Sequence, residues 1–218
     1  PHLKDAYWLN VNYGMVQEAR RLGVSFTLVE AGGYLNVERQ RQQIEQCTSE
    51  GADALIVGPV SFRGLNEAII EIAKTMPVLA TVNDIENIGI TAKSGVSWIT
   101  MGRKAGEYLA TRHPADSDPV TVAWFPGPLG AGWVEFIEAG FKLGLVGSAV
   151  KIVVTKWGDT GKEIQRTLVQ EVLESHPDVD YIVGNALMAE AAISTLLNRK
   201  LEDKIKVVST YFTPAVYR

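Results

Sequence analysis

Apolar positions along the chain alternate between the spacing of an amphipathic helix and that of a short buried strand. The first helical run extends from Leu9 to Leu22 and stops at Gly23, a residue that commonly caps helices. Similar runs predict further helices at 37–50, 64–74, 98–112, 133–145, 162–175 and 186–197. Apolar stretches between them predict strands at 24–29, 54–57, 77–82, 120–125, 150–155, 180–183 and 205–210. This alternation predicts an α/β fold of parallel β-sheets flanked by helices.

The two halves of this pattern superpose when the chain is shifted by 126 residues. Under that shift the helix expected at 37–50 falls on the one at 163–176. Other features stay in register: strand 24–29 falls on 150–155, Gly14 on Gly140, Gly32 on Gly158, and Gly58 on Gly184. An order kept over about 50 residues indicates a repeat of domain size. We therefore expect two similar lobes, residues 1–97 and 98–218, divided near Lys93–Gly95, where the pattern breaks.

The composition is that of a folded protein and lacks the excess of positive charge typical of nucleic-acid-binding proteins. The 218 residues are 46% hydrophobic, and 21 Lys and Arg against 25 Asp and Glu give a net charge of −4. A protein that tracks phosphates needs a basic face, so we expect no nucleic-acid partner. No apolar run reaches the ~18–20 residues of a membrane span, so we expect no membrane insertion. A single cysteine, Cys47, excludes a disulfide within the chain and a multi-cysteine zinc site.

Candidate ligand contacts lie in the loops that follow the predicted strands. In open parallel sheets, ligands bind beyond the carboxyl ends of the strands, and in a two-lobed protein these edges face a common cleft. The loops, together with the link between the lobes, carry Tyr7, Trp8, Tyr34, Trp98, Trp133, Trp157 and Tyr211. One aromatic residue at such a position is more often a packing residue than a ligand contact. Their concentration at strand ends nevertheless predicts an aromatic-lined pocket.

A pocket of this kind suits a methylated cationic head group or a stacked sugar ring. Ring faces attract the cation, whose methyl groups are desolvated at little cost. A sugar needs carboxylates, amides and arginines to satisfy its hydroxyl groups. The loop 126–132 has no polar side chain, and no arginine follows the first loop of either lobe, although Asn83, Asp84 and Asn185 are available. The residues therefore favour the methylated head group.

Catalytic and metal-binding motifs are weak throughout the sequence. The three histidines are expected to be solvated or to cap a helix: His2, His113 and His176. The glycines of Gly127–Gly132 form G-x-x-G-x-G, which differs from the dinucleotide fingerprint. Asp5 and Asp84 are expected to hydrogen-bond ligand or backbone rather than to act as an acid/base pair, and Cys47 to be an inert core thiol. We therefore expect neither catalytic residues nor a cofactor or metal.

Several segments carry a family resemblance over the whole chain: Leu3–Trp8 with Asn12–Gly14, Glu30–Tyr34, Gly95–Trp98 with Met101–Gly102, Pro126–Pro128, Glu163–Arg166, Ala189–Ala192 and Val216–Arg218. The most specific are Asp5–Trp8 and Ala31–Tyr34. On these segments the chain resembles a type I periplasmic binding protein. Within that family it is similar to the trimethylamine N-oxide sensors that partner a sensor histidine kinase.

The resemblance implies a periplasmic sensor rather than an enzyme, with trimethylamine N-oxide closed in the cleft between the lobes. The periplasmic domain of a sensor histidine kinase would be its partner. The implied ligand-binding residues are Tyr7, Trp8, Tyr34, Trp98 and Tyr211, with Asp5 and Asp84 at polar pocket positions, whereas Trp133 comes only from the cleft argument. The resemblance also implies that the chain is an excerpt, preceded by a signal peptide and first strand and followed by a C-terminal return segment.

Three other functions stay open at this point. A sugar-binding protein of a transport system would share the fold, but the apolar loop 126–132 counts against it. The effector domain of a transcriptional repressor also shares the fold and would follow a basic helix-turn-helix. A small hydrolase or nucleotide enzyme finds no supporting motif.

Overall fold

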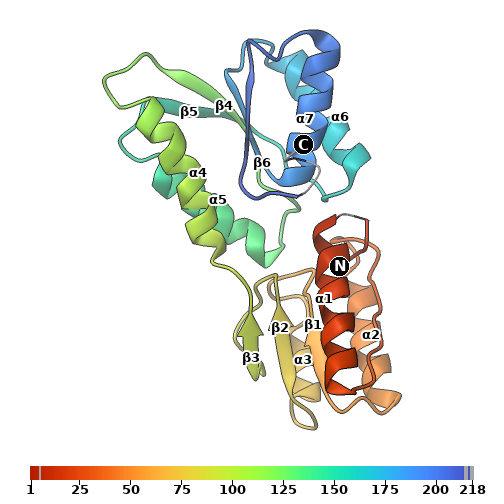
Figure 1. Cartoon of the computed structure of the whole chain (residues 1–218). Coiled ribbons are helices and arrows are strands. Elements are labelled where there is room, and N and C mark those ends of the chain that lie inside the picture. Colours follow the sequence, from red (N-terminus) through yellow and green to blue (C-terminus); the bar gives the residue numbers. More distant parts are fainter. Residues whose placement is uncertain (5, 214–215, 217–218) are drawn as a thin grey trace. The chain divides into compact units, whose positions relative to one another are not determined.

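The computed structural model describes residues 1–4, 6–213 and 216 (Figure 1). The chain forms two compact units. The first comprises Pro1–Val96 together with Gly130–Trp133, and the second comprises the rest of the chain from Ser97 onward. The division expected between residues 97 and 98 lies next to this boundary. The segment Gly130–Trp133, expected in the second lobe, clusters with the first unit instead.

The first unit builds a parallel sheet with helices packed against it. Its elements are α1 (Ala6–Leu22), α2 (Val37–Ser49), β1 (Leu55–Val57), α3 (Asn66–Ile72), β2 (Val78–Thr81) and β3 (Ala92–Ser94). Within the described residues the strand order is β1-β2-β3, and both neighbouring pairs are parallel. Apolar side chains of β1 and β2 form the core with α2 and α3, including Ile44, Val57, Leu65, Ile69 and Val78.

The second unit has a larger sheet covered on both faces. Its elements are α4 (Trp98–Arg112), β4 (Val120–Phe125), α5 (Gly132–Gly144), β5 (Val150–Thr155), α6 (Lys162–Ser175), β6 (Tyr181–Gly184), α7 (Ala186–Arg199) and β7 (Lys206–Ser209). In the described part of the chain the order is β5-β4-β6-β7, all parallel. Helices α6 and α7 cover one face, and α4 and α5 cover the other (Figure 1). On the latter face the Trp124 ring stacks on Phe141 of α5 at 4.2 Å.

The α/β fold with parallel sheets flanked by helices is therefore confirmed. The strands expected at 120–125 and 150–155 and the helix expected at 162–175 have the predicted bounds. The 126-residue shift also places α2 on α6 and β1 on β6. Among the residues described, no helix is both long and apolar enough to cross a lipid bilayer.

The prediction of a strand at 24–29 is wrong. The segment is extended but carries no ladder in the described structure, and Val24, Leu28 and Val29 are exposed. Its counterpart under the shift, β5, is a strand because it pairs with β4. The position corresponding to β4 in the first unit falls before residue 1. A strand needs a hydrogen-bonded neighbour, which apolar patterning alone does not supply.

Two further differences concern the first unit. Residues expected to break the pattern, Lys93 and Ser94, form β3 beside β2 although all of β3 is exposed, so no apolar signal marked it. Helix α1 is confirmed, but Leu9 and Tyr13 face solvent while Trp8 and Ala19 are buried. The packing of the large Trp8 ring sets the rotation of this helix.

Helices α4 and α5 approach each other through glycines. A methyl group on Gly102 would lie 2.0 Å from the Ile137 carbonyl oxygen, and one on Gly140 would lie 2.0 Å from that of Ile99. Backbones this close leave no room for any side chain at the crossing. The four-residue spacing of Gly102 and Gly106 repeats in α5, and each of these glycines faces backbone of the other helix.

Candidate functional site

An aromatic cluster gathers in the first unit at the carboxyl ends of its strands. Tyr34 is at its centre, with the His2 ring 5.7 Å away and the Trp133 ring 6.3 Å away, both edge-on. Trp8 lies on the first turns of α1, with Tyr7 edge-on to it at 6.2 Å. Four of the rings are buried, and Tyr7 is half-buried. The structure thus brings together four predicted residues from segments more than a hundred residues apart.

The Tyr34 hydroxyl group is held by two donors. Trp8 Nε1 donates to its oxygen at 3.3 Å, and Asn83 Nδ2 donates to it at 3.1 Å. A hydroxyl oxygen has two lone pairs and one hydrogen, so any further hydrogen bond of this group is one that it donates. These two bonds tie Tyr34 to α1 and to the end of β2.

The loop that follows β1 supports this cluster. Gly58 lies under the Trp8 ring, where a methyl group would approach Trp8 Cη2 to 2.6 Å. The buried Gln40 of α2 donates to the Gly58 carbonyl at 3.0 Å and accepts from the Val60 amide at 2.9 Å. A glutamine at the same position of α6, Gln165, likewise binds backbone carbonyls of its own unit. Gly58 is therefore required for close approach of the ring.

Of the two aspartates predicted to contact the ligand, Asp5 and Asp84, the structure describes only Asp84. Asp84 Oδ1 accepts from its neighbour Ile85 at 2.8 Å and pairs with Lys93 Nζ at 2.7 Å. Its carbonyl oxygen lies 2.3 Å from where a methyl group on Gly132 would be, so it also limits the segment that carries Trp133. The Asp84 carboxylate therefore has a structural role, which is to pair with Lys93. Asp5 lies outside the described residues.

The second unit brings two other predicted residues together. Trp98 begins α4 and is buried, and its ring lies edge-on to Tyr211 at 6.1 Å. Tyr211 follows β7, and its carbonyl oxygen accepts from Ser209 Oγ at 2.5 Å. Tyr211 thus lies in the loop after β7 and Trp98 on the first turn of α4, and a ligand contact for either residue stays a prediction.

Buried polar side chains line the strand ends of the second unit as well. Asn185 caps α7 by accepting from Met188 N at 2.9 Å, and its Nδ2 donates to Gln165 Oε1 at 3.2 Å. Glu190 accepts from Thr213 Oγ1 at 3.0 Å and lies 3.7 Å from Lys162 Nζ. The Asn185 and Thr213 contacts join strand-end loops to helices, whereas the pair of Glu190 with Lys162 joins α7 to α6.

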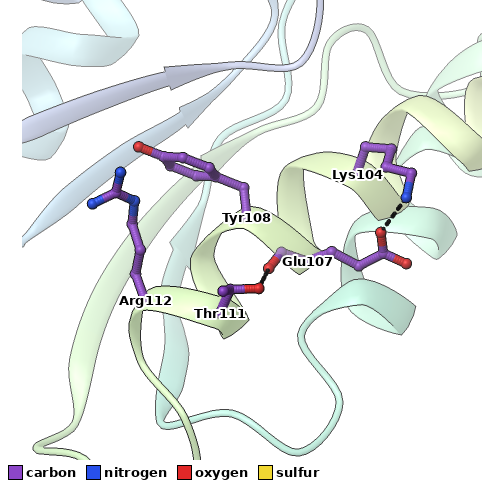
Figure 2. Close-up of a pocket in the computed structure, with 5 residues that line it drawn as sticks. All are labelled: Lys104, Glu107, Tyr108, Thr111 and Arg112. Carbon is purple, nitrogen blue, oxygen red and sulfur yellow. Dashed lines mark hydrogen bonds and ion pairs between the residues drawn. The ribbon is translucent and has the colours of Figure 1, made fainter.

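An open groove of about 480 Å³ lies along α4. Its lining comes from one helix: Lys104, Glu107, Tyr108, Thr111 and Arg112 (Figure 2). Lys104 Nζ pairs with Glu107 at 2.8 Å, and the Arg112 guanidinium lies 4.6 Å from the Tyr108 ring centre. Because these charged groups engage one another and no predicted residue is among them, we do not assign the ligand to this groove.

Metal binding and thiol chemistry find no support in the residues described. No group of three or more His, Cys, Asp or Glu side chains is placed to hold a metal ion in the described part of the chain. Burial raises the pKa of the Cys47 thiol, with a smaller contribution from the Glu50 charge. Cys47 therefore stays protonated at neutral pH, which is the state of an unreactive thiol.

The whole chain, residues 1–218, matches the family model described as periplasmic binding protein domain. The chain belongs to this periplasmic binding protein family.

Two members of this family are similar over the whole chain. Periplasmic protein TorT of Escherichia coli K12 is 41% identical over 220 residues. An ABC transporter solute-binding protein from Bradyrhizobium sp. BTAi1, solved with bound bis-tris, is 50% identical with a TM-score of 0.76. The chain spans 62% of the length of TorT and 66% of the Bradyrhizobium protein.

A TorT protein has been solved in complex with the TorS sensor domain. The chain matches that structure at 42% identity and covers 74% of the matched chain. The TM-score is 0.84 for the complex without ligand and 0.83 for the complex with TMAO. Sugar-binding members, such as one solved with D-arabinose, match at 20% identity with a TM-score of 0.86, which shows the shared fold.

Sequence reasoning missed two members of the aromatic cluster of this periplasmic binding protein. His2 was expected to be solvated or capping, whereas it is buried against Tyr34. Asn83 was noted only as an available amide, and its bond to Tyr34 joins residues 49 apart in the chain. The one feature of the sequence that pointed to Asn83 was its position at the end of the strand expected at 77–82. The two other histidines, His113 and His176, do occupy C-cap positions as expected.

Proposed function

We propose that the chain acts as a periplasmic solute sensor that binds trimethylamine N-oxide and signals to the periplasmic domain of a membrane sensor histidine kinase. Two similarities support the proposal: 41% identity to TorT over the whole chain, and 42% identity to the TorT chain solved with the TorS sensor domain and TMAO. The proposal is of a binding protein and includes no catalytic step.

The arrangement around Tyr34 is the observation that carries this proposal. Trimethylamine N-oxide joins three methyl groups on a positive nitrogen to a negative oxygen. The rings of Trp8, Tyr34 and Trp133 offer electron-rich faces to the methylated nitrogen. Trp8 Nε1 and Asn83 Nδ2, which both donate to the Tyr34 hydroxyl oxygen, supply N–H donors in the same cluster. A bare carboxylate in that place would repel the oxide.

We further propose that Tyr7, Trp98 and Tyr211 contribute ring faces to the same ligand. Asp5 stays a predicted ligand contact. For Asp84 the carboxylate pairs with Lys93, so its proposed contribution is to the shape of the loop rather than to the ligand.

Uptake of a small amine is the second candidate function. The 50% identity to the ABC transporter solute-binding protein solved with bis-tris favours it. Bis-tris is a tertiary amine. Trimethylamine, the compound whose oxidation gives trimethylamine N-oxide, is also a tertiary amine. A transport protein would be expected to bind tightly, whereas a sensor of an abundant solute works at micromolar concentrations or above.

Calorimetric titration of the full chain with trimethylamine N-oxide, choline, glycine betaine and ribose tests the proposal. We expect trimethylamine N-oxide to bind most tightly and ribose not to bind. Preference for ribose would overturn the proposed ligand class. Pull-down of the sensor domain of the partner kinase, with and without trimethylamine N-oxide, tests signalling. Ligand and partner must change each other's affinity by the same factor.

A further inference from the structure

The backbone at the carboxyl end of β2 adopts a rare turn. The amide of Asn83 donates to the carbonyl of Thr81 at 2.8 Å, two residues back, and the residue between them, Val82, has a φ of 66°. This is a γ-turn of the uncommon form in which the central φ is positive. A β-branched side chain strongly disfavours that conformation, so contacts with the surrounding structure must hold it.

The turn contacts residues 94–96, the exit stretch, after which the chain leaves the first unit. The Val82 amide donates to the Ser94 carbonyl of β3 at 2.8 Å. A methyl group on Gly95 would lie 3.2 Å from the Val82 carbonyl oxygen, so the backbone at Gly95 packs directly against the turn. The turn is therefore bound to the last residues of the first unit before the chain passes to the second.

The residue after the turn contacts Gly130–Trp133, the re-entry segment, where the chain returns to the first unit. A methyl group on Gly132 would lie 2.3 Å from the Asp84 carbonyl oxygen, so the two backbones are in direct contact. The Phe62 amide holds the same segment, because it donates to the Gly130 carbonyl at 3.2 Å. Asp84 therefore limits the position of the second stretch at which the chain passes between the units.

Asn83, between these two contacts, binds the aromatic cluster. Its buried side chain donates through Nδ2 to the Pro59 carbonyl at 2.8 Å and to the Tyr34 hydroxyl oxygen at 3.1 Å. Three consecutive residues therefore hold three different parts of the first unit: Val82 holds the exit stretch, Asn83 the cluster and Asp84 the re-entry segment.

We infer that residues 82–84, the coupling loop, transmit a displacement of the exit stretch or of the re-entry segment to the other one and to the aromatic cluster. A γ-turn joins three residues through one backbone hydrogen bond, so these residues cannot shift independently. The β-branched side chain of Val82 restricts the turn further. A ligand that moves the cluster thereby acts on both stretches at which the chain passes between the units. The transmission is a property of the chain itself and does not depend on the identity of the ligand.

Amide hydrogen exchange of the full chain, followed residue by residue by NMR, tests this transmission. Gly132→Ala pushes on Asp84 from the re-entry segment. We expect the Val82 amide, which binds the exit stretch, to exchange roughly tenfold faster or more, since exchange reports the free energy of local opening. Gly95→Ala pushes on Val82 instead, and the Phe62 amide, which binds the re-entry segment, should exchange faster. The second effect should be smaller, because the methyl group lies 3.2 Å rather than 2.3 Å from its neighbour.

Controls separate transmission from a general loss of stability. The amide of Ile69, a fully buried residue of α3, is the internal reference with which the exchange rates are compared. Gly51→Ala strains the same unit at another place, because Gly51 has a φ of 84° and its added methyl group meets no atom within 4 Å. It should leave the Val82 and Phe62 amides unchanged relative to the reference. Val82→Gly frees the turn but keeps its backbone, so it should remove the effect of Gly95→Ala on Phe62.

The outcomes distinguish this inference from the proposed function. A folded Gly132→Ala variant whose Val82 amide keeps its rate relative to the reference overturns the inference, and so does an equal response in Gly51→Ala. If Gly132→Ala does not fold, an unchanged rate at the Phe62 amide of Gly95→Ala overturns it instead. A chain that fails to bind trimethylamine N-oxide overturns the proposed function and leaves these exchange rates as they are.

Discussion

At the scale of single residues, Trp8 has two roles, one in the packing of the core and one in the candidate site. Its indole N–H donates to Tyr34, and its ring packs closely on Gly58. The side chain is only 8% exposed, so it belongs to the core of the first unit as well as to the candidate site. Its removal therefore affects both folding and binding, for different physical reasons.

Trp8→Ala should lower the free energy of unfolding by ~3–5 kcal/mol, the usual cost of deleting a buried aromatic side chain. It should weaken binding of trimethylamine N-oxide by ~0.5–2 kcal/mol through loss of a ring face. Trp8→Phe keeps a ring face, so it should lose less stability and less affinity for trimethylamine N-oxide than Trp8→Ala. Urea denaturation gives the first quantity, and calorimetry well below the melting temperature gives the second. An alanine variant that is folded and binds as well as the parent would make Trp8 a packing residue only.

At the scale of elements, the contact between α4 and α5 depends on the absence of side chains. Gly102, Gly106, Gly140 and Gly144 each face backbone atoms of the opposite helix at distances that no Cβ could occupy. Glycine lowers helix propensity by ~1 kcal/mol relative to alanine, so these positions cost local stability that close packing offsets.

Gly102→Ala should therefore destabilise the second unit, by at least the ~1–3 kcal/mol typical of overpacking, because the helices must move apart. Gly14→Ala is the matched control, since Gly14 lies within α1 and has no atom within 4 Å of an added methyl group. It should stabilise the protein by ~0.5–1 kcal/mol through helix propensity. Differential scanning calorimetry measures both. A Gly102→Ala variant as stable as the control would contradict the close packing.

The extended segment 24–29 gives a second prediction at this scale. Its amides lack a ladder partner in the described structure, whereas those of β5 pair with β4. Hydrogen exchange followed by mass spectrometry should therefore show peptides of 24–29 exchanging at least a hundredfold faster than those of β5. Equal protection of the two segments would show that 24–29 is paired in solution.

At the scale of the whole molecule, the size of the ligand limits what binding can achieve. Trimethylamine N-oxide has five non-hydrogen atoms, and the best small ligands gain ~1.5 kcal/mol per such atom. The product, roughly −7.5 kcal/mol, corresponds to a dissociation constant no tighter than about 3 µM. A ligand can shift a conformational equilibrium only by its difference in affinity for the two states. Much of the energy that separates signalling states must then come from the partner.

We therefore expect micromolar to sub-millimolar affinity for trimethylamine N-oxide in isothermal titration calorimetry of the full chain. Addition of the partner's sensor domain should change this affinity, and the ligand should change the partner's affinity by an equal factor. Glycine betaine, which has the same trimethylated nitrogen but a carboxymethyl group in place of the oxide, is the matched control. A nanomolar constant for the isolated chain would mean that the ligand is larger than trimethylamine N-oxide.

The sequence by itself determined the fold class and most of its elements. Alternating periodicity predicted the parallel α/β units because buried strands and amphipathic helices have distinct apolar spacings. The 126-residue register predicted the match of α2 with α6 and of β1 with β6. Aromatic residues at strand ends predicted one pocket for the rings of both lobes, and of these Trp8 and Trp133 do contact Tyr34.

Only the tertiary structure decided which of these groups touch and how. Segment 24–29 has the apolar pattern of a strand but pairs with no strand among the described residues, and β3 is a strand without such a pattern because β2 supplies its hydrogen bonds. The donor role of Asn83 depends on Pro59 and Tyr34, which are distant in sequence. Apolar periodicity reports burial along one segment, whereas hydrogen-bond partners and side-chain direction come from chain crossings that bring distant segments together.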